Sequence, residues 1–183
     1  MMDCEEELTQ AEIEGISIPH KVYNLKFIQR YSITPRICNE TVAEHSFFVA
    51  TYVMELYKDY KFDLNKAVQM ALIHDFAESY IGDITLSTKT MCPELVKAVA
   101  SAERDVMYQN FPSFIYDLYM EYEQRTSVES LIVKLADTLQ VRQYARNEIE
   151  LGNTSPTMWN IFNRAVDDID LFERKLAVYK RQN

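Results

Sequence analysis

The segment ALIHDFAESYIGDI, residues 71–84, places four ionisable side chains at the end of an apolar stretch. His74 and Asp75 are direct neighbours, Glu78 follows after two residues, and Asp83 follows a glycine. Neighbours on a helix point about 100° apart, so His74 and Asp75 can share only a ligand that lies between them. A divalent transition metal is such a ligand, because imidazole and carboxylate groups together suit it.

Two further ionisable residues lie in apolar helical patterns and could complete a metal site. His45 is on the apolar face of the preceding predicted helix, and Asp137 is within the run LIVKLADTLQV. An unpaired charge at a core-facing position is costly, and one metal would satisfy all four groups. The alternative is structural, with a hydrogen-bonded core histidine and an aspartate paired with Lys134 or Arg142. That alternative requires several separate buried polar groups, so the metal is favoured.

Glu78 and Asp83 could supply chemistry beside such a metal. Glu78 is four residues after His74, so the two share a helix face. A carboxylate there can orient or deprotonate an attacking water, or protonate a leaving oxygen. Each residue also has a structural alternative: Glu78 as a solvated residue near a helix end, and Asp83 as a turn aspartate.

Helical periodicity predicts the elements that carry these groups. The chain has only three glycines, fewer than a sheet protein of this size usually spends on turns, so an all-α fold is expected. The polar stretch 83–93 is predicted to be the longest loop between elements. The predicted helices cover approximately residues 19–30, 41–60, 65–82, 94–110, 113–123, 126–151 and 155–179.

Three of these helices have recognisable start signals. Thr41 with Glu44, and Thr126 with Glu129, have the spacing of a capping box. Asn65 is the expected N-cap of the helix that leads to the ionisable cluster. The apolar pattern after residue 41 predicts a core face made of His45, Phe48, Val49 and Tyr52.

Length and composition limit the class of protein. The 183 residues suit a single domain, 1–183, with an acidic lead-in over about residues 1–18. The net charge of −9 disfavours general nucleic-acid binding, because an acidic surface repels phosphate backbones. The three cysteines form no C-x-x-C pattern, which favours reduced thiols in the cytoplasm. Neither a signal peptide nor a membrane-spanning run is predicted.

Four segments resemble, in their order and spacing, the motifs of one known family. QRYSITPR, ETVAEHS, IHDFAESYIGDI and VKLADTL are similar to motifs of the HD-domain phosphohydrolase superfamily, and most closely to its small 5′-deoxynucleotidase branch. The related phage dATP hydrolases share these motifs and a compact length. The similarity extends over roughly residues 22–155. It implies a compact all-α HD-domain bundle around a single metal site.

The resemblance implies the same metal ligands as the residue types do. His45, His74, Asp75 and Asp137 would hold one divalent transition metal, which in the family is often cobalt, manganese or zinc. Magnesium is a further option with a triphosphate substrate. A metal of this kind polarises phosphoryl oxygens and acidifies a bound water.

The resemblance also assigns roles around the metal. Glu78 corresponds to the family's catalytic glutamate, and Asp83 to the aspartate that accepts a hydrogen bond from the sugar 3′-hydroxyl. The cations Arg30, Lys89 and Lys134 are expected near the phosphate or its leaving path, which an acidic protein needs for an anionic substrate. For both lysines, a solvated surface position is the alternative.

Tyr31 is where the sequence departs from the family pattern. The deoxynucleotidase branch typically has tryptophan here, packed against the sugar to exclude a 2′-hydroxyl, whereas this chain has the smaller tyrosine. The strictness of deoxyribose selection therefore stays open. Arg36 and Glu40 are expected to support the same loop, either beside the substrate or as a structural ion pair.

The resulting hypothesis is a metal-dependent hydrolase of deoxynucleoside mono-, di- or triphosphates in nucleotide-pool control. Its expected partner is a small-molecule deoxynucleotide, without nucleic acid or membrane, and the expected assembly is a homo-oligomer, either a dimer or a larger ring. A cytoplasmic location in a bacterium or phage-infected cell is expected by analogy. One alternative is an HD-type hydrolase of a cyclic nucleotide or an alarmone. A non-enzymatic helical assembly module without a tightly bound metal is the other.

Overall fold

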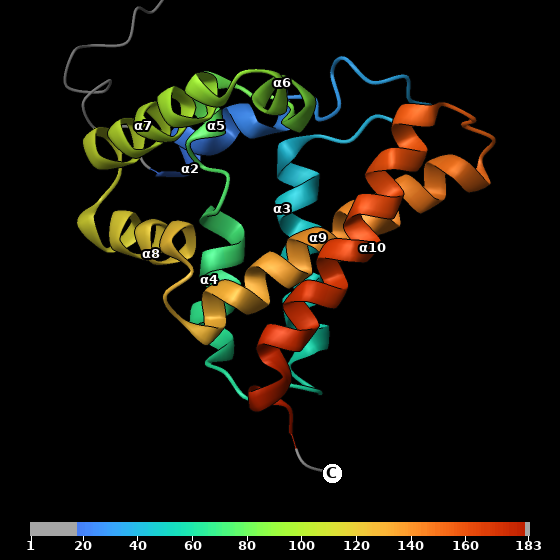
Figure 1. The fold of residues 1–183 in the computed structure, drawn as a ribbon. Helices are drawn as coiled ribbons and strands as arrows, with labels where there is room; N and C mark the ends of the chain where they lie inside the picture. Colours follow the sequence, from blue (N-terminus) through green and yellow to red (C-terminus); the bar gives the residue numbers. More distant parts are fainter. Residues whose placement is uncertain (1–17, 182–183) are drawn as a thin grey trace, which may run out of the picture.

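The computed structural model describes residues 18–181, and over this range the chain is helical (Figure 1). Extended pairing within this range is limited to isolated bridges at Gln29–Thr41 and Tyr60–Lys180, so the predicted all-α fold is confirmed. The predicted acidic lead-in lies outside the described residues, apart from Ile18. The elements are α2 (Ile18–Val22), η1 (Tyr23–Lys26), α3 (Val42–Leu56), α4 (Leu64–Ile73), α5 (Glu78–Ile81), α6 (Leu86–Met91), α7 (Pro93–Asn110), α8 (Ser113–Gln124), α9 (Val128–Glu150), α10 (Pro156–Leu176) and η2 (Ala177–Tyr179).

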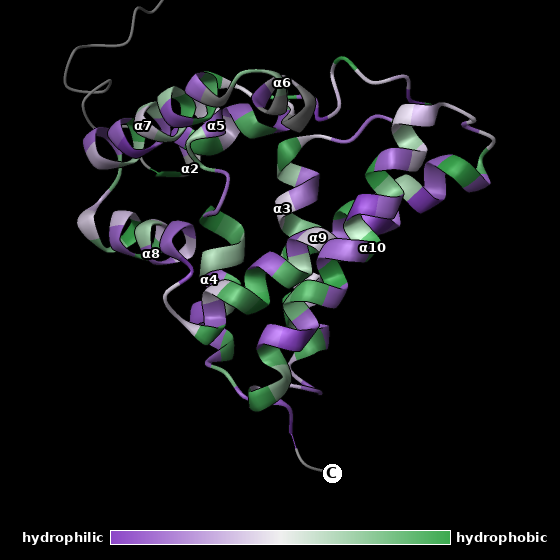
Figure 2. Ribbon diagram, in the orientation of Figure 1, coloured by the Kyte–Doolittle hydropathy of each residue, from purple (hydrophilic) through white to green (hydrophobic). Residues whose placement is uncertain are grey.

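Helix α9 is central to the bundle. It packs against α3, α4, α8 and α10, and it runs antiparallel to α10 (Figure 1). Figure 2 shows hydrophobic residues gathered where α4, α9 and α10 approach one another. Burial of this apolar surface is the main force that holds the helices together. The cluster includes Val49 and Val53 of α3, Met70 of α4, Leu135 of α9 and Leu176 of α10.

A second apolar cluster joins α7 and α8 to the end of α4. Met107, Phe111 and Tyr119 pack there against Ile73 and Ala77. Residues 74–76, which carry two of the candidate ligands, therefore lie between two residues of this cluster, Ile73 and Ala77, and both ends of the segment are packed. Within residues 18–181, no helix is both long and apolar enough to cross a membrane.

The start of α3 agrees with its sequence signal. The Thr41 hydroxyl accepts from the Glu44 backbone N–H at 3.2 Å, and Glu44 accepts from the Thr41 backbone N–H at 2.8 Å, which is a capping box. The predicted core face is only partly right. His45 and Val49 are buried, but Phe48 is 49% exposed. The face of α3 that carries His45 and Val49 packs against α9, and Phe48 lies beside that face.

The caps of α4 and α9 differ from the predictions. Asp63 caps α4, accepting from the Lys66 backbone N–H at 3.1 Å, so α4 begins before the predicted Asn65. Ser127 caps α9, in a reciprocal pair with Ser130. The predicted partner Glu129 is buried and accepts instead from the Asp63 backbone N–H at 2.9 Å. Because its carboxylate binds the N-terminus of α4, Glu129 does not cap α9. The N-cap is therefore Ser127 and not the predicted Thr126.

The helix predicted over 65–82 is interrupted at the ionisable cluster. Helix α4 ends at Ile73, and the next backbone bonds span three residues, as in Phe76 N–H to Ile73 C=O and Glu78 N–H to Asp75 C=O, both 3.0 Å. This tighter turn reorients Asp75 relative to an α-helix. Gly82 ends α5 with a φ of 78°, a left-handed value that favours glycine.

Two other segments differ from the sequence reading. The predicted helix 19–30 ends early, because the Arg30 backbone N–H donates to Glu40 C=O and the Val42 N–H to Ile28 C=O, at 2.9 and 3.0 Å. This pairing brings Arg30 to the start of α3. The predicted polar loop 83–93 contains α6, whose N-cap Thr85 accepts from the Thr88 backbone N–H.

Candidate metal centre and adjoining pocket

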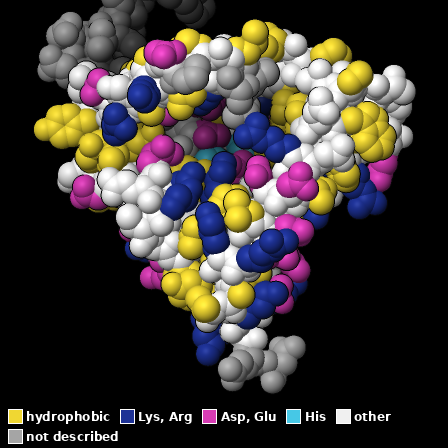
Figure 3. Space-filling model, viewed as in Figure 1, with side chains coloured by type: hydrophobic (Ala, Val, Ile, Leu, Met, Phe, Trp, Pro, Cys, Tyr) yellow, Lys and Arg dark blue, Asp and Glu magenta, His cyan; other side chains and the backbone are white. Residues whose placement is uncertain are grey.

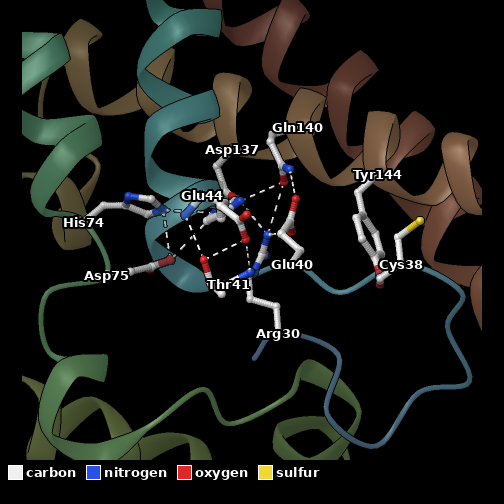
Figure 4. Close-up of polar contacts among 11 residues, drawn as sticks. Arg30, Cys38, Glu40, Thr41, Glu44, His74, Asp75, Asp137, Gln140 and Tyr144 are labelled. Atoms are coloured by element: carbon white, nitrogen blue, oxygen red, sulfur yellow. Dashed lines mark hydrogen bonds and ion pairs between the residues drawn. The ribbon is translucent and has the colours of Figure 1, made fainter. Parts of the chain in front are cut away.

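Three predicted ligands, His45, His74 and Asp75, come together where α3 meets the turn after α4, and Asp137 of α9 approaches His45 (Figure 4). His45 Nε2 lies 3.3 Å from His74 Nε2 and 3.3 Å from Asp137 Oδ1. Asp75 Oδ2 lies 3.2 Å from His74 Nε2 and 3.7 Å from His45 Nε2. His45, His74 and Asp75 form a group with one potential ligand atom each, all within 4.8 Å of one another.

These spacings fit a metal between the side chains. Ligand bonds of about 2.0–2.1 Å in a tetrahedral centre would hold neighbouring ligand atoms about 3.3 Å apart. The His74 Nδ1–H donates to the Ala71 carbonyl at 2.7 Å, so Nε2 presents its lone pair to the centre. Two imidazole nitrogens that face each other at 3.3 Å need a cation or a proton between them.

The electrostatic environment favours the forms that bind metal. Burial lowers the pKa of His74 below its ordinary value, which keeps the imidazole neutral. For Asp137, burial opposes ionisation, but the charge of Lys134 and a hydrogen bond from His45 outweigh it and hold the pKa well below its usual range. A neutral imidazole and an ionised carboxylate are the ligand states that a divalent metal requires.

His45 is oriented by residues of α9 and of the loop before α3. Its Nδ1 lies 2.7 Å from Gln140 Oε1, and Arg30 also contacts this nitrogen. Gln140 in turn donates from Nε2 to Glu40, and it accepts from Arg30 at 3.2 Å. When His45 Nε2 binds a metal, Nδ1 carries the proton, and the Gln140 carbonyl oxygen is then its natural acceptor.

Gln140 was missed from sequence, because a glutamine in a long helix has no motif of its own. Its position three residues after Asp137 was an available signal, since it places both on one helix face. Of the two alternatives for Arg36 and Glu40, the ion pair between them is wrong. Glu40 binds Arg30 at 2.9 Å, while Arg36 donates to Asn39 and to the Tyr31 carbonyl.

A pocket of about 510 Å³ adjoins the ligand cluster, a size typical of small-molecule sites. Figure 3 shows a hollow with histidine at its floor and basic and acidic side chains around it. Its lining brings together most of the predicted substrate and ligand residues: Arg30, Tyr31, Asp83, Lys89, Lys134 and Asp137.

The two predicted lysines are held by carboxylates at the edge of this pocket. Lys134 donates to Asp137 Oδ2 at 2.6 Å, and Lys89 lies 3.6 Å from Glu103. The structural alternative for Asp137, a pair with Lys134, is therefore present together with the approach of Asp137 to His45. Both lysines line the pocket, so neither is a remote surface lysine.

Tyr31 lies in the pocket wall with an uncommon backbone. Its φ is 57°, a left-handed value that costs energy for a residue with a side chain. The ring stacks on Tyr144 of α9, with centroids 4.5 Å apart and planes 5° apart. The Tyr31 hydroxyl is buried without a hydrogen-bond partner among the described residues. This stacking fixes the ring at the pocket before any substrate binds.

Glu78 and Asp83 share an acidic environment next to the ligand cluster. Burial, together with the charges of Asp75 and Asp83, raises the pKa of Glu78 to about 10. Burial likewise raises the pKa of Asp83, although the Tyr31 backbone N–H donates to its carboxylate. Glu78 is therefore protonated at neutral pH in the metal-free protein, where it can donate a proton.

The raised pKa of Glu78 predicts a pH dependence of stability. The folded protein holds the Glu78 proton where the unfolded chain has lost it, between about pH 4.5 and 10. The free energy of unfolding should therefore fall as pH rises through this window, by up to ~1.4 kcal/mol per pH unit from this group. Glu78→Gln should remove that contribution, which urea unfolding of metal-free protein would measure at several pH values.

The control for this measurement is Glu55→Gln, because Glu55 is an exposed carboxylate near the far end of α3 from His45. Its pH profile should follow that of the unsubstituted protein. Parallel profiles for Glu78→Gln and the unsubstituted protein would contradict the proposed environment of Glu78.

Comparisons with known proteins identify relatives with a named activity. A 5′-deoxynucleotidase of Xenopus laevis is 25% identical over 150 residues, covering 79% of this chain and 74% of that protein. A 5′-deoxynucleotidase of Vibrio vulnificus is 28% identical over 141 residues, covering 70% and 73%.

Solved structures share the fold. A Pyrococcus horikoshii protein matches with a TM-score of 0.68 and 29% identity, covering 86% of this chain and 97% of that one. The cyanophage S-2L HD phosphohydrolase, solved with dA and one catalytic Zn²⁺, matches with a TM-score of 0.63, 17% identity and coverages of 88% and 98%. A family model described as HD domain matches residues 22–159, which is most of the chain. This protein, with its paired histidines and aspartates at one helical junction, therefore belongs to the HD-domain family.

Proposed function

We propose that this protein is a metal-dependent 5′-deoxynucleotidase, which hydrolyses the phosphate ester of a deoxynucleoside 5′-phosphate. The observation that carries the proposal is the grouping of His45, His74 and Asp75 at ligand spacing, with Asp137 3.3 Å from His45, beside a nucleotide-sized pocket. The relatives named 5′-deoxynucleotidase support this substrate class.

The four residues are proposed to hold one divalent ion: cobalt, manganese or zinc, or magnesium with a triphosphate. When bound, such an ion would polarise a phosphoryl oxygen and acidify a water. Lys134 and Arg30 line the pocket next to these residues. They would balance the charge of a phosphate, which the net charge of −9 otherwise repels.

Glu78 is proposed as the proton-transfer residue. Its protonated carboxyl can donate to the leaving 5′ oxygen, and the resulting carboxylate can accept a proton when the next water reacts. Asp83 and Tyr31 would receive the sugar, since both line the same pocket and the Tyr31 backbone is tied to the Asp83 carboxylate. Asp83 would accept a hydrogen bond from the 3′-hydroxyl.

The experiment that tests this function is a screen of phosphate release and products. Metal-stripped protein is resupplied with cobalt, manganese, zinc or magnesium and incubated with all common deoxy- and ribonucleoside mono-, di- and triphosphates, and separately with cyclic nucleotides and alarmones. Release of phosphate from deoxynucleotides, with the deoxynucleoside as a product, is expected. Turnover confined to cyclic nucleotides or alarmones, or no turnover and no bound metal, would overturn the proposal.

Gln140→Leu is predicted to weaken metal binding by about 10–100-fold, as loss of a residue that orients a metal ligand commonly does. The substitution removes the Oε1 acceptor that lies 2.7 Å from His45 Nδ1. Metal affinity is measured by competition with a chelator. The control is Gln143→Leu, because Gln143 is on the same helix and bonds Asn147 at the surface. Equal affinities for the two variants would show that Gln140 does not orient His45.

A further inference from the structure

Helix α10 forms a wall of the pocket that no motif indicated. Its contributing residues recur about every turn, so one face of the helix lines the cavity. Because α10 runs antiparallel to α9 (Figure 1), later residues of α10 lie beside earlier residues of α9. The wall consists of Thr157, Asn160, Ile161, Arg164, Ala165 and Asp168.

Arg164 differs from the other three cations that line the pocket. Its nearest carboxylate is Asp168, at 3.8 Å, whereas the other cations lie 2.9, 3.6 and 2.6 Å from theirs. The side chain of Arg164 is also 56% exposed, compared with 15% for Arg30, 28% for Lys89 and 34% for Lys134. It is therefore the cation at the pocket mouth, and the one held most loosely.

The ends of the pocket suit different parts of a nucleotide. Ile161 of α10 packs in one apolar cluster with Tyr31 and Tyr144, which suits the uncharged nucleoside. Arg164 is one turn further along α10, so the antiparallel packing carries it towards the Lys134 end of α9. A phosphate chain that starts beside Lys134 and Asp137 would thus pass Arg164 on its way to solvent.

We propose that Arg164 binds the phosphates beyond the scissile one, and that the pocket accepts deoxynucleoside di- and triphosphates through it. The inference rests on the proposed function, and it assigns a binding residue to the outer phosphates of its di- and triphosphate substrates. A guanidinium presents a planar fork of N–H donors that matches two phosphate oxygens. Asp168, the present partner of Arg164, would compete only weakly with a phosphate for the guanidinium. An exposed ion pair between residues four apart contributes little to stability.

The test measures dissociation constants for dAMP, dADP and dATP with manganese, in a Glu78→Gln background that prevents turnover. Arg164→Gln should weaken dATP binding about tenfold, the effect of one lost charge-assisted hydrogen bond, and dAMP binding less than about twofold. Asp168→Asn should act in the opposite direction and tighten dATP binding, because it removes a negative charge from the same wall.

Arg174→Gln is the matched control. Arg174 is also on α10 and pairs with Asp170 at 3.9 Å, but it is 81% exposed and does not line the pocket. Its dATP affinity should equal that of the background protein. Equal weakening of all three nucleotides by Arg164→Gln, or no weakening of any, would overturn the inference.

Failure of the inference and failure of the function give different results. Hydrolysis is measured on the unsubstituted protein, whereas the contact with the outer phosphates is measured by binding. Turnover of dAMP together with dATP affinities that ignore Arg164 would leave the nucleotidase function intact and remove this inference. If Arg164→Gln selectively weakened dATP binding but the unsubstituted protein hydrolysed no nucleotide, the inference would stand and the nucleotidase function would fail.

Discussion

Asp75→Asn is expected to abolish nucleotide hydrolysis and to lower the amount of bound metal. Asp75 Oδ2 faces both imidazole nitrogens, at 3.2 and 3.7 Å, and the amide that replaces it is a poor ligand for a divalent transition metal. The loss should exceed the ~10–100-fold that removal of a supporting residue costs. Metal content by elemental analysis and phosphate release measure the two effects on the same preparation.

Folding must be separated from metal binding in this experiment. Asp75 is only half-buried at the edge of the cluster, so helical circular dichroism should stay unchanged. Asp105→Asn, at an exposed position of α7, is the control and should retain both metal and activity. A fully active, metal-loaded Asp75→Asn protein would show that the metal, if any, is held elsewhere.

Glu78→Gln is expected to have the second largest effect on turnover. Unlike Asp75→Asn, it should leave the bound metal in place. The amide cannot transfer the proton, so turnover should fall about 10²–10⁴-fold. Metal content should stay near that of the unsubstituted protein, because Glu78 is not among the four side chains at ligand spacing. Rates under saturating substrate, with metal content measured in parallel, check both statements.

The exposed Glu55→Gln variant again provides the control, and its rate should match that of the unsubstituted protein. Normal turnover in Glu78→Gln would remove Glu78 from the mechanism. Loss of metal together with turnover would instead make Glu78 part of the ligand set. Taken with Asp75→Asn, the pair therefore separates residues that hold the metal from the residue that moves a proton.

Local signals in the sequence predicted the helix ends well where the residues that form the cap belong to the same segment of chain. The Thr41–Glu44 capping box and the ends of α7 and α10 are within a few residues of their predicted positions. Errors arose where a distant contact competed. Glu129 has the spacing of a cap residue but bonds across to the start of α4, and Phe48 fits the apolar pattern but lies outside the α9 contact.

In the candidate site, too, local sequence signals were predictive and distant contacts were not. The types and order of His45, His74, Asp75 and Asp137 indicated a metal site, because buried ionisable groups need a shared partner. The sequence could not show that the helix stops at Ile73, since both sides of that turn pack against the distant helices α7 and α8. The distances of 3.2–3.7 Å among the ligand atoms come from the packing of α3 and α9 around it.

The sequence by itself determined the all-α class and the HD-domain motifs, and it indicated four candidate ligands and the acidic pair Glu78 and Asp83, because helix periodicity, capping and motif spacing are properties of neighbouring residues. Only the tertiary structure decided which polar residues support or extend the site. Gln140 reaches His45 across 95 positions of chain, and Arg164 enters the pocket because α10 folds back along α9. Such contacts depend on how helices pack, which no local pattern records.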